Sequence, residues 1–209
     1  MEKIIQAGNL TKVYGEKETS VTALDNIDVQ FNENEFTAIM GPSGSGKSTL
    51  LHCLAGLDRP TSGQILLKDQ DISTLNDKQL TKIRRDSFGF VFQAFNLIPT
   101  LTAEENITLP ASIAGRKPDM DWIKQVVETV DISDRLTHRP NELSGGQQQR
   151  VAAARAMATK PEVIFADEPS GNLDSKSSKE LLTFMKSVVE ELNQTIIMVT
   201  HDPYAASYA

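Results

Sequence analysis

The pattern of apolar and polar positions along this chain changes its period several times, and each change predicts a different element. Five short, mostly apolar runs predict buried β-strands, at residues 36–40, 65–67, 88–92, 163–166 and 195–199. Residues 48–57 and 180–192 carry apolar side chains at helical intervals. Continuous apolar strands that alternate with helices are typical of a parallel sheet covered on both faces. The pattern therefore predicts an α/β fold.

Two other stretches predict different local structure. Residues 27–31 alternate apolar and polar side chains and residues 32–34 form a turn signal, so we expect a strand and a turn before the strand at 36–40. The stretch from about Thr102 to Arg139 is mainly helical in pattern, with apolar side chains at helical spacing between residues 122 and 130.

Composition and charge narrow the class of protein. The 209 residues are enough for one sizeable core, with or without a smaller inserted lobe. A net charge of -7 and the lack of a dense Lys/Arg tract disfavour nucleic acid as the main partner. Cys53 is the only cysteine, which fits a reducing compartment such as the cytosol. No stretch approaches the roughly 18–20 apolar residues that span a bilayer, so work at a membrane would need a partner.

A glycine-rich segment lies between the predicted strand at 36–40 and the predicted helix at 48–57. Residues 41–48 read Gly-Pro-Ser-Gly-Ser-Gly-Lys-Ser, which fits the eight-position pattern G-x-x-x-x-G-K-[ST]. Backbone N–H groups of such a loop form an anion-binding nest, and the helix adds its positive end. Lys47 would reach the β- and γ-phosphates of a nucleotide and Ser48 would hold Mg²⁺. The alternative, a Gly/Ser-rich surface turn, is disfavoured by the complete pattern.

Two adjacent carboxylates, Asp167 and Glu168, follow the apolar run at 163–166. They would lie at the C-terminal end of a buried strand, where ligands of open α/β sheets bind. Asp167 is a suitable anchor for Mg²⁺, which leaves Glu168 to position or deprotonate the attacking water. The alternative is an acidic turn that stabilises a nearby helix N-terminus.

The segment Leu143–Gln147 reads Leu-Ser-Gly-Gly-Gln and precedes a helix-like stretch at 148–158. It therefore predicts a helix N-cap with free N–H groups, which is a second phosphate site. Either the chain folds both phosphate sites onto one ligand, or a second copy supplies one of them. The residues alone leave this choice open.

These motifs resemble those of the ATP-binding subunits of ABC transporters, over essentially the whole chain. Six motifs match in order: Walker A at 41–48, the Q-loop at Gln93, the signature sequence at 143–147, Walker B at 163–168, the D-loop at 170–174 and the switch histidine at His201. The resemblance implies a P-loop NTPase (RecA-like) core with a mainly parallel sheet, an N-terminal antiparallel β subdomain and an inserted α-helical subdomain. It implies one domain over 1–209, with the core at 1–93 and 144–209 and the helical subdomain at about 94–143.

The resemblance also implies ATP and Mg²⁺ as cofactors and a role for each matching residue. The implied catalytic residues are Glu168, His201, Gln93 and Lys47, and the implied metal ligands are Ser48, Gln93 and Asp167. The implied ATP-binding residues are the adenine-stacking Tyr14, then Gly41, Pro42, Ser43, Gly44, Ser45, Gly46, Lys47, Ser48 and Thr49, and finally Ser144, Gly145, Gly146, Gln147 and Asp174. Outside this context, Gln93 would be a polar residue at a strand end and Tyr14 an ordinary strand aromatic.

Partners follow from the same resemblance. In the family, the signature loop of one subunit closes over the ATP held by another, so we expect a head-to-tail dimer of this chain with itself or a homologous subunit. We also expect a transmembrane permease partner and a location on the cytoplasmic face of the cell membrane, with no direct contact to nucleic acid. Soluble ABC ATPases that act on DNA or ribosomes carry a long coiled coil or a second ATPase unit, and neither is present here.

Within the family, residues 83–93 and 95–106 are similar to the macrolide-exporter and lipoprotein-releasing group. This similarity predicts export, or extraction of a substrate from the membrane, although polar amino-acid importers share the Phe-Asn-Leu at 95–97. A regulator that signals through a membrane partner without transport would have the same sequence features. Family members usually continue past the switch histidine, whereas this chain stops at Ala209, so we expect a truncated C-terminus.

Overall fold

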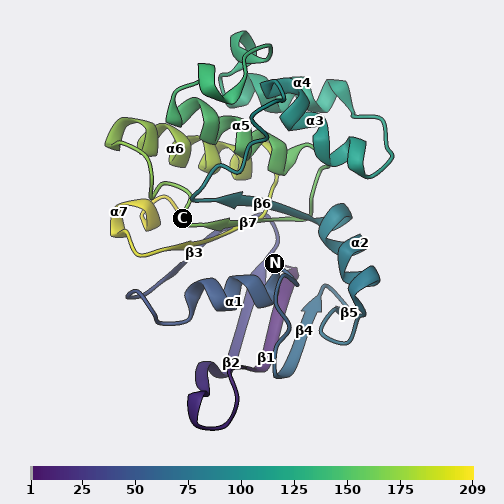
Figure 1. The fold of residues 1–209 in the computed structure, drawn as a ribbon, viewed down its shortest axis with the longest axis vertical. Helices are drawn as coiled ribbons and strands as arrows, with labels where there is room; N and C mark the ends of the chain where they lie inside the picture. The colour runs from purple at the N-terminus through teal and green to yellow at the C-terminus, as the bar shows by residue number, and fades with distance from the viewer. Residues whose placement is uncertain (1) are drawn as a thin grey trace.

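The computed structural model describes residues 2–209 and contains two β-sheets, of which the parallel sheet has helices on both faces (Figure 1). The first sheet has the strand order β3-β8-β7-β6, and every pair of neighbours runs parallel. Its strands are Phe36–Met40 (β3), Ile196–Thr200 (β8), Val163–Asp167 (β7) and Phe88–Phe92 (β6). The predicted parallel sheet is therefore confirmed, with strand ends within one residue of those expected.

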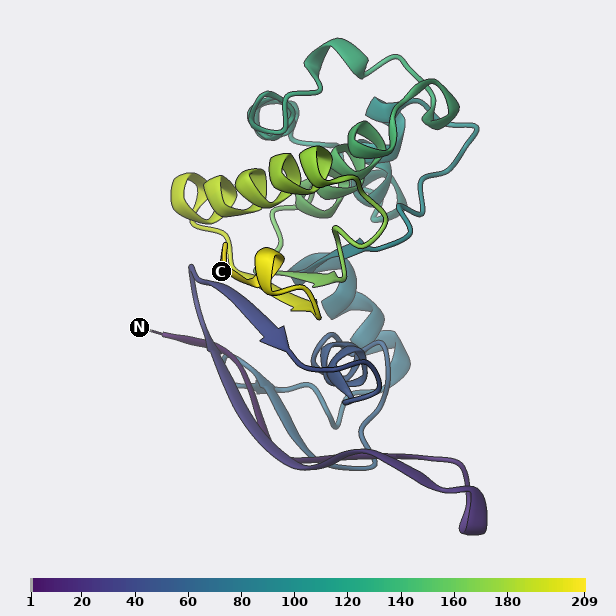
Figure 2. The same cartoon turned by 90° about the vertical axis from the view of Figure 1, so that its left-hand side faces the viewer.

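The second sheet is antiparallel and has the order β2-β1-β4-β5. Its strands are Lys3–Tyr14 (β1), Val21–Asn32 (β2), Ser62–Leu67 (β4) and Gln70–Asp71 (β5). The hairpin of β1 and β2 extends away from the body of the molecule, and the 3-10 turn Lys17–Thr19 lies at its tip (Figure 2). The expected N-terminal antiparallel part is thus present.

Helices separate and cover the sheets. The first helix, α1 (Lys47–Leu54), lies between the parallel and the antiparallel sheet (Figures 1 and 2). The other helices are α2 (Asp77–Ser87), α3 (Ala103–Ile113), α4 (Met120–Thr129), α5 (Gly145–Met157), α6 (Ser175–Leu192) and α7 (Pro203–Ala206), with 3-10 turns at Ser133–Arg135 and Pro140–Glu142. Helices α5 and α6 cover the other face of the parallel sheet, and α3 and α4 lie beyond α5 (Figure 1). No helix within residues 2–209 combines the length and the apolar character needed to cross a membrane.

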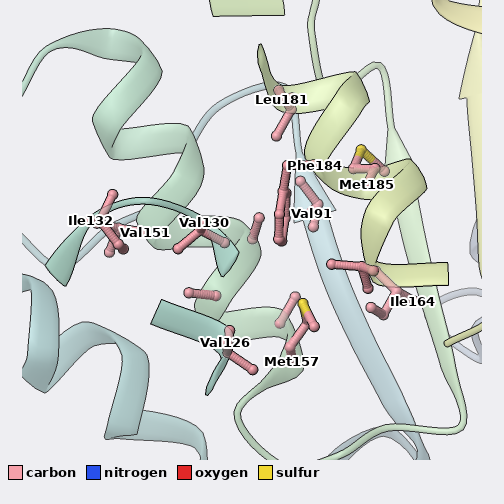
Figure 3. Close-up of a cluster of buried hydrophobic side chains, with 14 of the residues drawn as sticks. Val91, Val126, Val130, Ile132, Val151, Met157, Ile164, Leu181, Phe184 and Met185 are labelled. Atoms are coloured by element: carbon pink, nitrogen blue, oxygen red, sulfur yellow. The ribbon is translucent and has the colours of Figure 1, made fainter. Parts of the chain in front are cut away.

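The hydrophobic core consists of two clusters, one on each face of the parallel sheet. Because successive strand residues point to opposite faces, Ile164 packs into the cluster under α5 and α6 (Figure 3), whereas Phe165 packs into the cluster around α1. The first cluster continues into α3 and α4 without a break. The division of the chain into a core and a helical subdomain at about 94–143 stays a prediction.

Three helices differ from the sequence-based expectation. Helix α1 ends at Leu54 rather than at residue 57. Helix α6 begins at Ser175, five residues before the expected start, because Asp174 accepts hydrogen bonds from the backbone N–H groups of residues 176 and 177. Helix α2 was not expected at all, although Asn76 and Gln79 form a capping box at its start. The first turns of α2 and α6 are polar, so the spacing of apolar residues does not reveal where these two helices begin.

Candidate nucleotide site

The glycine-rich loop leads from the end of β3 at Met40 into the start of α1 at Lys47, as expected. Gly46 has a φ of 86° and lies so close to the backbone carbonyl of Ala23 that a Cβ atom would clash with it. Lys47 is 9% exposed, and its Nζ donates a hydrogen bond to the carbonyl oxygen of Pro42 at 2.7 Å. The cation therefore lies over the loop itself, next to the N-terminus of α1.

Ser48 and Asp167 come together although 119 residues separate them. The Ser48 hydroxyl donates to Oδ1 of Asp167 at 2.9 Å, and Nε2 of His52 lies 3.4 Å from Oδ2 of the same carboxylate. Burial alone would raise the pKa of Asp167, but the hydrogen bonds from His52 and Ser48 outweigh it and lower the pKa. A hydroxyl beside an ionised carboxylate fits Mg²⁺, which prefers few hard oxygen ligands from protein. No group of three or more His, Cys, Asp or Glu side chains within residues 2–209 is arranged as a metal site by itself.

Glu168 lies beside His201 at the ends of the neighbouring strands β7 and β8. Nδ1 of His201 is 2.8 Å from Oε1 of Glu168, and the Thr200 hydroxyl donates to Oε2 at 3.4 Å. Glu168 has a φ of 47°, a left-handed conformation that is uncommon for a residue with a side chain, and its N–H donates to the carbonyl of Val199. Both residues line a cleft of about 440 Å³ that also includes Ser170.

Gln93 follows β6 and bonds to the loop that follows Glu168. Its Nε2 donates to Oδ1 of Asn172 at 3.0 Å, and Nδ2 of Asn172 donates to the backbone carbonyl of Gln93 at 3.1 Å. The side-chain hydrogen bonds of Gln93 within residues 2–209 thus lead to Asn172 and not to Ser48 or Asp167. A metal-binding role of Gln93 stays a prediction.

The segment 144–147 forms the start of α5, as expected. The Ser144 hydroxyl accepts from the N–H of Gln147 at 3.3 Å, and Oε1 of Gln147 accepts from the N–H of Ser144 at 2.9 Å, which is a capping box. Gly145 and Gly146 occupy the first turn of the helix. Within the part of the chain that the structure describes, no hydrogen bond or ion pair joins residues 144–147 to the loop and helix start at 41–49.

Tyr14, the last residue of β1, is 41% exposed. Its hydroxyl donates to Oδ2 of Asp58 at 2.5 Å, and Nζ of Lys12 lies 4.7 Å from the ring centroid while donating to Oδ1 of Asp58. The hydrogen bond to Asp58 and partial burial raise the pKa of Tyr14, and a weaker opposing effect comes from the hydroxyl of Thr49 in α1. The aromatic ring is therefore fixed in orientation beside α1.

Four polar residues of this region were not among the predicted site residues, although one of them, Asn172, lies in the D-loop motif: His52, Asp58, Gln149 and Asn172. For His52 a signal existed, since it lies four residues after Ser48 and so on the same face of α1. The contacts of the other three depend on chain crossings that local spacing does not encode.

Comparison with known proteins shows the family of this chain. A family profile described as ABC transporter matches residues 24–171. The chain is 47% identical over 204 residues to an uncharacterised ABC transporter ATP-binding protein of Thermotoga maritima, covering 97% of this chain and 87% of that protein. It is 45% identical to the lipoprotein-releasing system ATP-binding protein LolD of Cytophaga hutchinsonii, covering 97% and 91%.

Longer relatives and solved structures match as well. The macrolide export ATP-binding/permease protein MacB of Marinobacter nauticus is 46% identical, but the chain, 99% of which is aligned, spans only 32% of its length. The cassette MJ0796, a Methanocaldococcus jannaschii protein, superposes with a TM-score of 0.86 at 43% identity in a dimeric post-hydrolysis structure bound to ADP and Pi. That alignment covers 98% of this chain and 91% of the MJ0796 chain.

The phosphate loop, the parallel sheet and the carboxylates at its C-terminal edge define a P-loop nucleotide-binding protein. The chain belongs to the ABC transporter family, as an ATP-binding and ATP-hydrolysing cassette. The predicted family and fold class are thereby confirmed, and a soluble ABC ATPase that acts on nucleic acid or ribosomes is not favoured.

Proposed function

We propose that this cassette is the motor subunit of a membrane transporter, which hydrolyses ATP to drive export, or extraction of a substrate from the membrane, by a permease partner. The observation that carries the proposal is the convergence of Ser48, Asp167, Glu168 and His201 at the C-terminal edge of the parallel sheet. One side of this cluster suits a metal-bound phosphate and the other suits an attacking water.

In the proposed reaction, the backbone N–H groups of residues 43–49 bind the phosphates, and Lys47 turns from the Pro42 carbonyl to a phosphate oxygen. Mg²⁺, held by Ser48, Asp167 and a relocated Gln93, would neutralise charge on the phosphates. Glu168 accepts a proton from the water whose oxygen attacks the γ-phosphorus as the bond to ADP breaks. His201 holds the Glu168 carboxylate through Nδ1, and its Nε2 would contact the γ-phosphate.

A second copy would complete the site. Residues 144–147 present a helix N-terminus that is not bonded to the loop of its own subunit, and Asp174 caps the nearby α6. We propose that these residues contact the ATP and the neighbouring loops of a partner cassette. The cassette MJ0796 is dimeric in two solved structures, which supports the association of two cassettes.

A cleft of about 500 Å³ beside β6 suits the permease partner. Its lining is mostly apolar and includes Phe90, Phe92 and the strongly exposed Ile113, together with Arg84 and Arg155. An apolar segment with acidic flanking residues fits this chemistry. Since β6 leads directly to Gln93, occupation of the cleft can act on the nucleotide site. The cassette would then work at the cytoplasmic face of the cell membrane.

The exporting direction rests on the relatives. Their names include lipoprotein-releasing, macrolide export and bacitracin export proteins. The regulatory candidate, a cassette that signals through its membrane partner without transport, would have the same nucleotide site, but these relatives do not favour it.

The test has two stages. Purified protein should hydrolyse ATP only with Mg²⁺, and Lys47→Ala should remove the activity because the phosphate-binding cation is lost. Affinity purification from the native cell should then recover an integral membrane protein, and reconstitution with that protein should give ATP-dependent release or export of a substrate. Recovery with ribosomes or nucleic acid would contradict the proposal, and signalling without substrate movement would favour the regulatory candidate.

A further inference from the structure

Gln149 is a fully buried amide on α5 that bonds to two loops of the nucleotide site. Its side chain is 0% exposed, and Nε2 donates to the backbone carbonyl of Pro169 at 2.6 Å and to that of Phe92 at 3.4 Å. Phe92 directly precedes Gln93, and Pro169 directly follows Glu168. One side chain therefore reaches the ends of the neighbouring strands β6 and β7 at the points where the site residues begin.

The orientation of this amide is determined by its surroundings. Carbonyl oxygens only accept hydrogen bonds, so the NH₂ group must face Pro169 and Phe92. Within residues 2–209 the Oε1 atom of Gln149 accepts no hydrogen bond. A buried acceptor in this state costs free energy, and beyond Arg150 the next four residues of α5, Val151 to Ala154, are apolar and buried. An apolar residue would be enough for packing at this position. The amide adds two hydrogen bonds, to the backbone carbonyls of Pro169 and Phe92.

The loops after β6 and β7, both bonded to Gln149, also bond to each other, and the loop after β7 begins with a strained residue. Glu168 has its left-handed φ of 47° one residue before Pro169, and such a conformation persists only where the surrounding contacts enforce it. Gln93 pairs with Asn172 of the loop that Pro169 begins. Loss of the Gln149 amide should therefore change the positions of both Glu168 and Gln93.

We propose that Gln149 is a positioning residue for ATP hydrolysis. It fixes the backbone at Phe92 and Pro169, and thereby sets the directions in which Gln93 and Glu168 leave their strands. It also ties both loops to α5, which begins at Gly145, the end proposed to meet a partner's ATP. Approach of the second copy at the N-terminus of α5 is transmitted through this amide to the water-activating side of the subunit's own site. The inference rests on the proposed hydrolysis.

The test replaces Gln149 by methionine, which has a similar length and no donor. We expect kcat for ATP to fall by about tenfold or more while the dissociation constant for a non-hydrolysable ATP analogue changes by less than about threefold. A fall in kcat without a matching change in the dissociation constant indicates that the lost contact stabilises the transition state and not the bound ATP. If the wild-type protein does not hydrolyse ATP, both the proposed function and this inference are overturned. If the wild-type protein is active, the comparison with Gln149→Met measures the effect of the amide alone.

The matched control is Asn106→Leu. Asn106 is another 0% exposed amide, whose Nδ2 donates to the carbonyls of Ile98 and Thr102 and, within residues 2–209, not to those of Phe92 or Pro169. The control should lose thermal stability like the methionine variant and keep the kcat of its folded fraction. A Gln149→Met kcat within about twofold of wild type, or an equal fall in both variants, overturns the inference. If the methionine variant does not fold, Gln149→Asn, which is too short to reach both carbonyls, is judged by the same criteria.

Discussion

Nδ1 of His201 lies 2.8 Å from Oε1 of Glu168, so the histidine after β8 holds the carboxylate that follows β7. An ionised carboxylate only accepts hydrogen bonds, and Nδ1 therefore carries the proton in this pair while Nε2 is left for another partner. The Thr200 hydroxyl engages the other oxygen of Glu168. Both oxygens are thus oriented from the same neighbouring strand, as a group that must position a water requires.

Glu168→Gln should leave ATP binding intact, abolish turnover and trap an ATP-bound dimer. The amide has the size of the carboxylate and can still bond to His201, but it cannot take a proton from water. Steady-state hydrolysis and gel filtration with ATP measure the two effects. Glu162→Gln is a suitable control, since Glu162 precedes the same strand and bonds to Ser87 at the opposite end. Normal hydrolysis by Glu168→Gln would exclude Glu168 as the base.

Tyr14→Ala should weaken the binding of ATP without weakening that of inorganic tripolyphosphate. The exposed ring is held by Asp58 and Lys12 in a fixed orientation, and loss of a base–aromatic stack costs about 1–3 kcal/mol, or roughly 5- to 150-fold in affinity. Tyr14→Phe keeps the ring but loses the bond to Asp58, so its affinity for ATP should lie between those of wild type and Tyr14→Ala. Calorimetric titration with ATP and with tripolyphosphate distinguishes the contribution of the base from that of the phosphates. An equal loss of affinity for both ligands would rule out stacking.

The sequence predicted the parallel sheet well because its signal is local. Strands β7 and β8 are apolar at nearly every position, since helices or the second sheet cover both faces. Strand β1 was not predicted as an element, because bulges and the positive φ of Asn9 interrupt its alternation. Helix α2 buries little beyond Leu80, so it lacks an apolar face wide enough to recognise.

The candidate site follows the same rule. The glycine-rich loop and the carboxylates at 167 and 168 are contiguous patterns, and their elements were identified from sequence. The bond between Ser48 and Asp167 spans 119 residues and depends on the order of strands in the sheet. The pairing of Gln93 with Asn172 is a further contact of this kind, which no spacing rule encodes.

Cys53 should resist thiol reagents at pH 8 in the native protein and react once in denaturant. Burial raises the pKa of its thiol to about 11, and the side chain is inaccessible to solvent. Because this folded-state pKa exceeds the ordinary value of 9.0, the thiol's contribution to stability is full below about pH 9 and is lost as the pH rises through about 11. The difference in unfolding free energy between wild type and Cys53→Ala should therefore shrink between pH 8 and pH 10.5. Rapid native labelling at pH 8 would contradict the burial.

Gly89→Ala should destabilise the protein by about 1–3 kcal/mol, the usual cost of overpacking a well-packed interior. Gly89 lies in β6, where a Cβ atom would meet the backbone carbonyl of Ala156 on α5, and two backbones cannot yield as a flexible side chain can. Gly8→Ala in β1 is the matched control, because its Cβ would make only an ordinary contact with Asp28. Urea unfolding of both variants measures the difference. Equal stability of the two variants would mean that β6 and α5 can move apart without a cost in free energy. The inference that α5 fixes the backbone at Phe92, and thereby Gln93, would then be weakened.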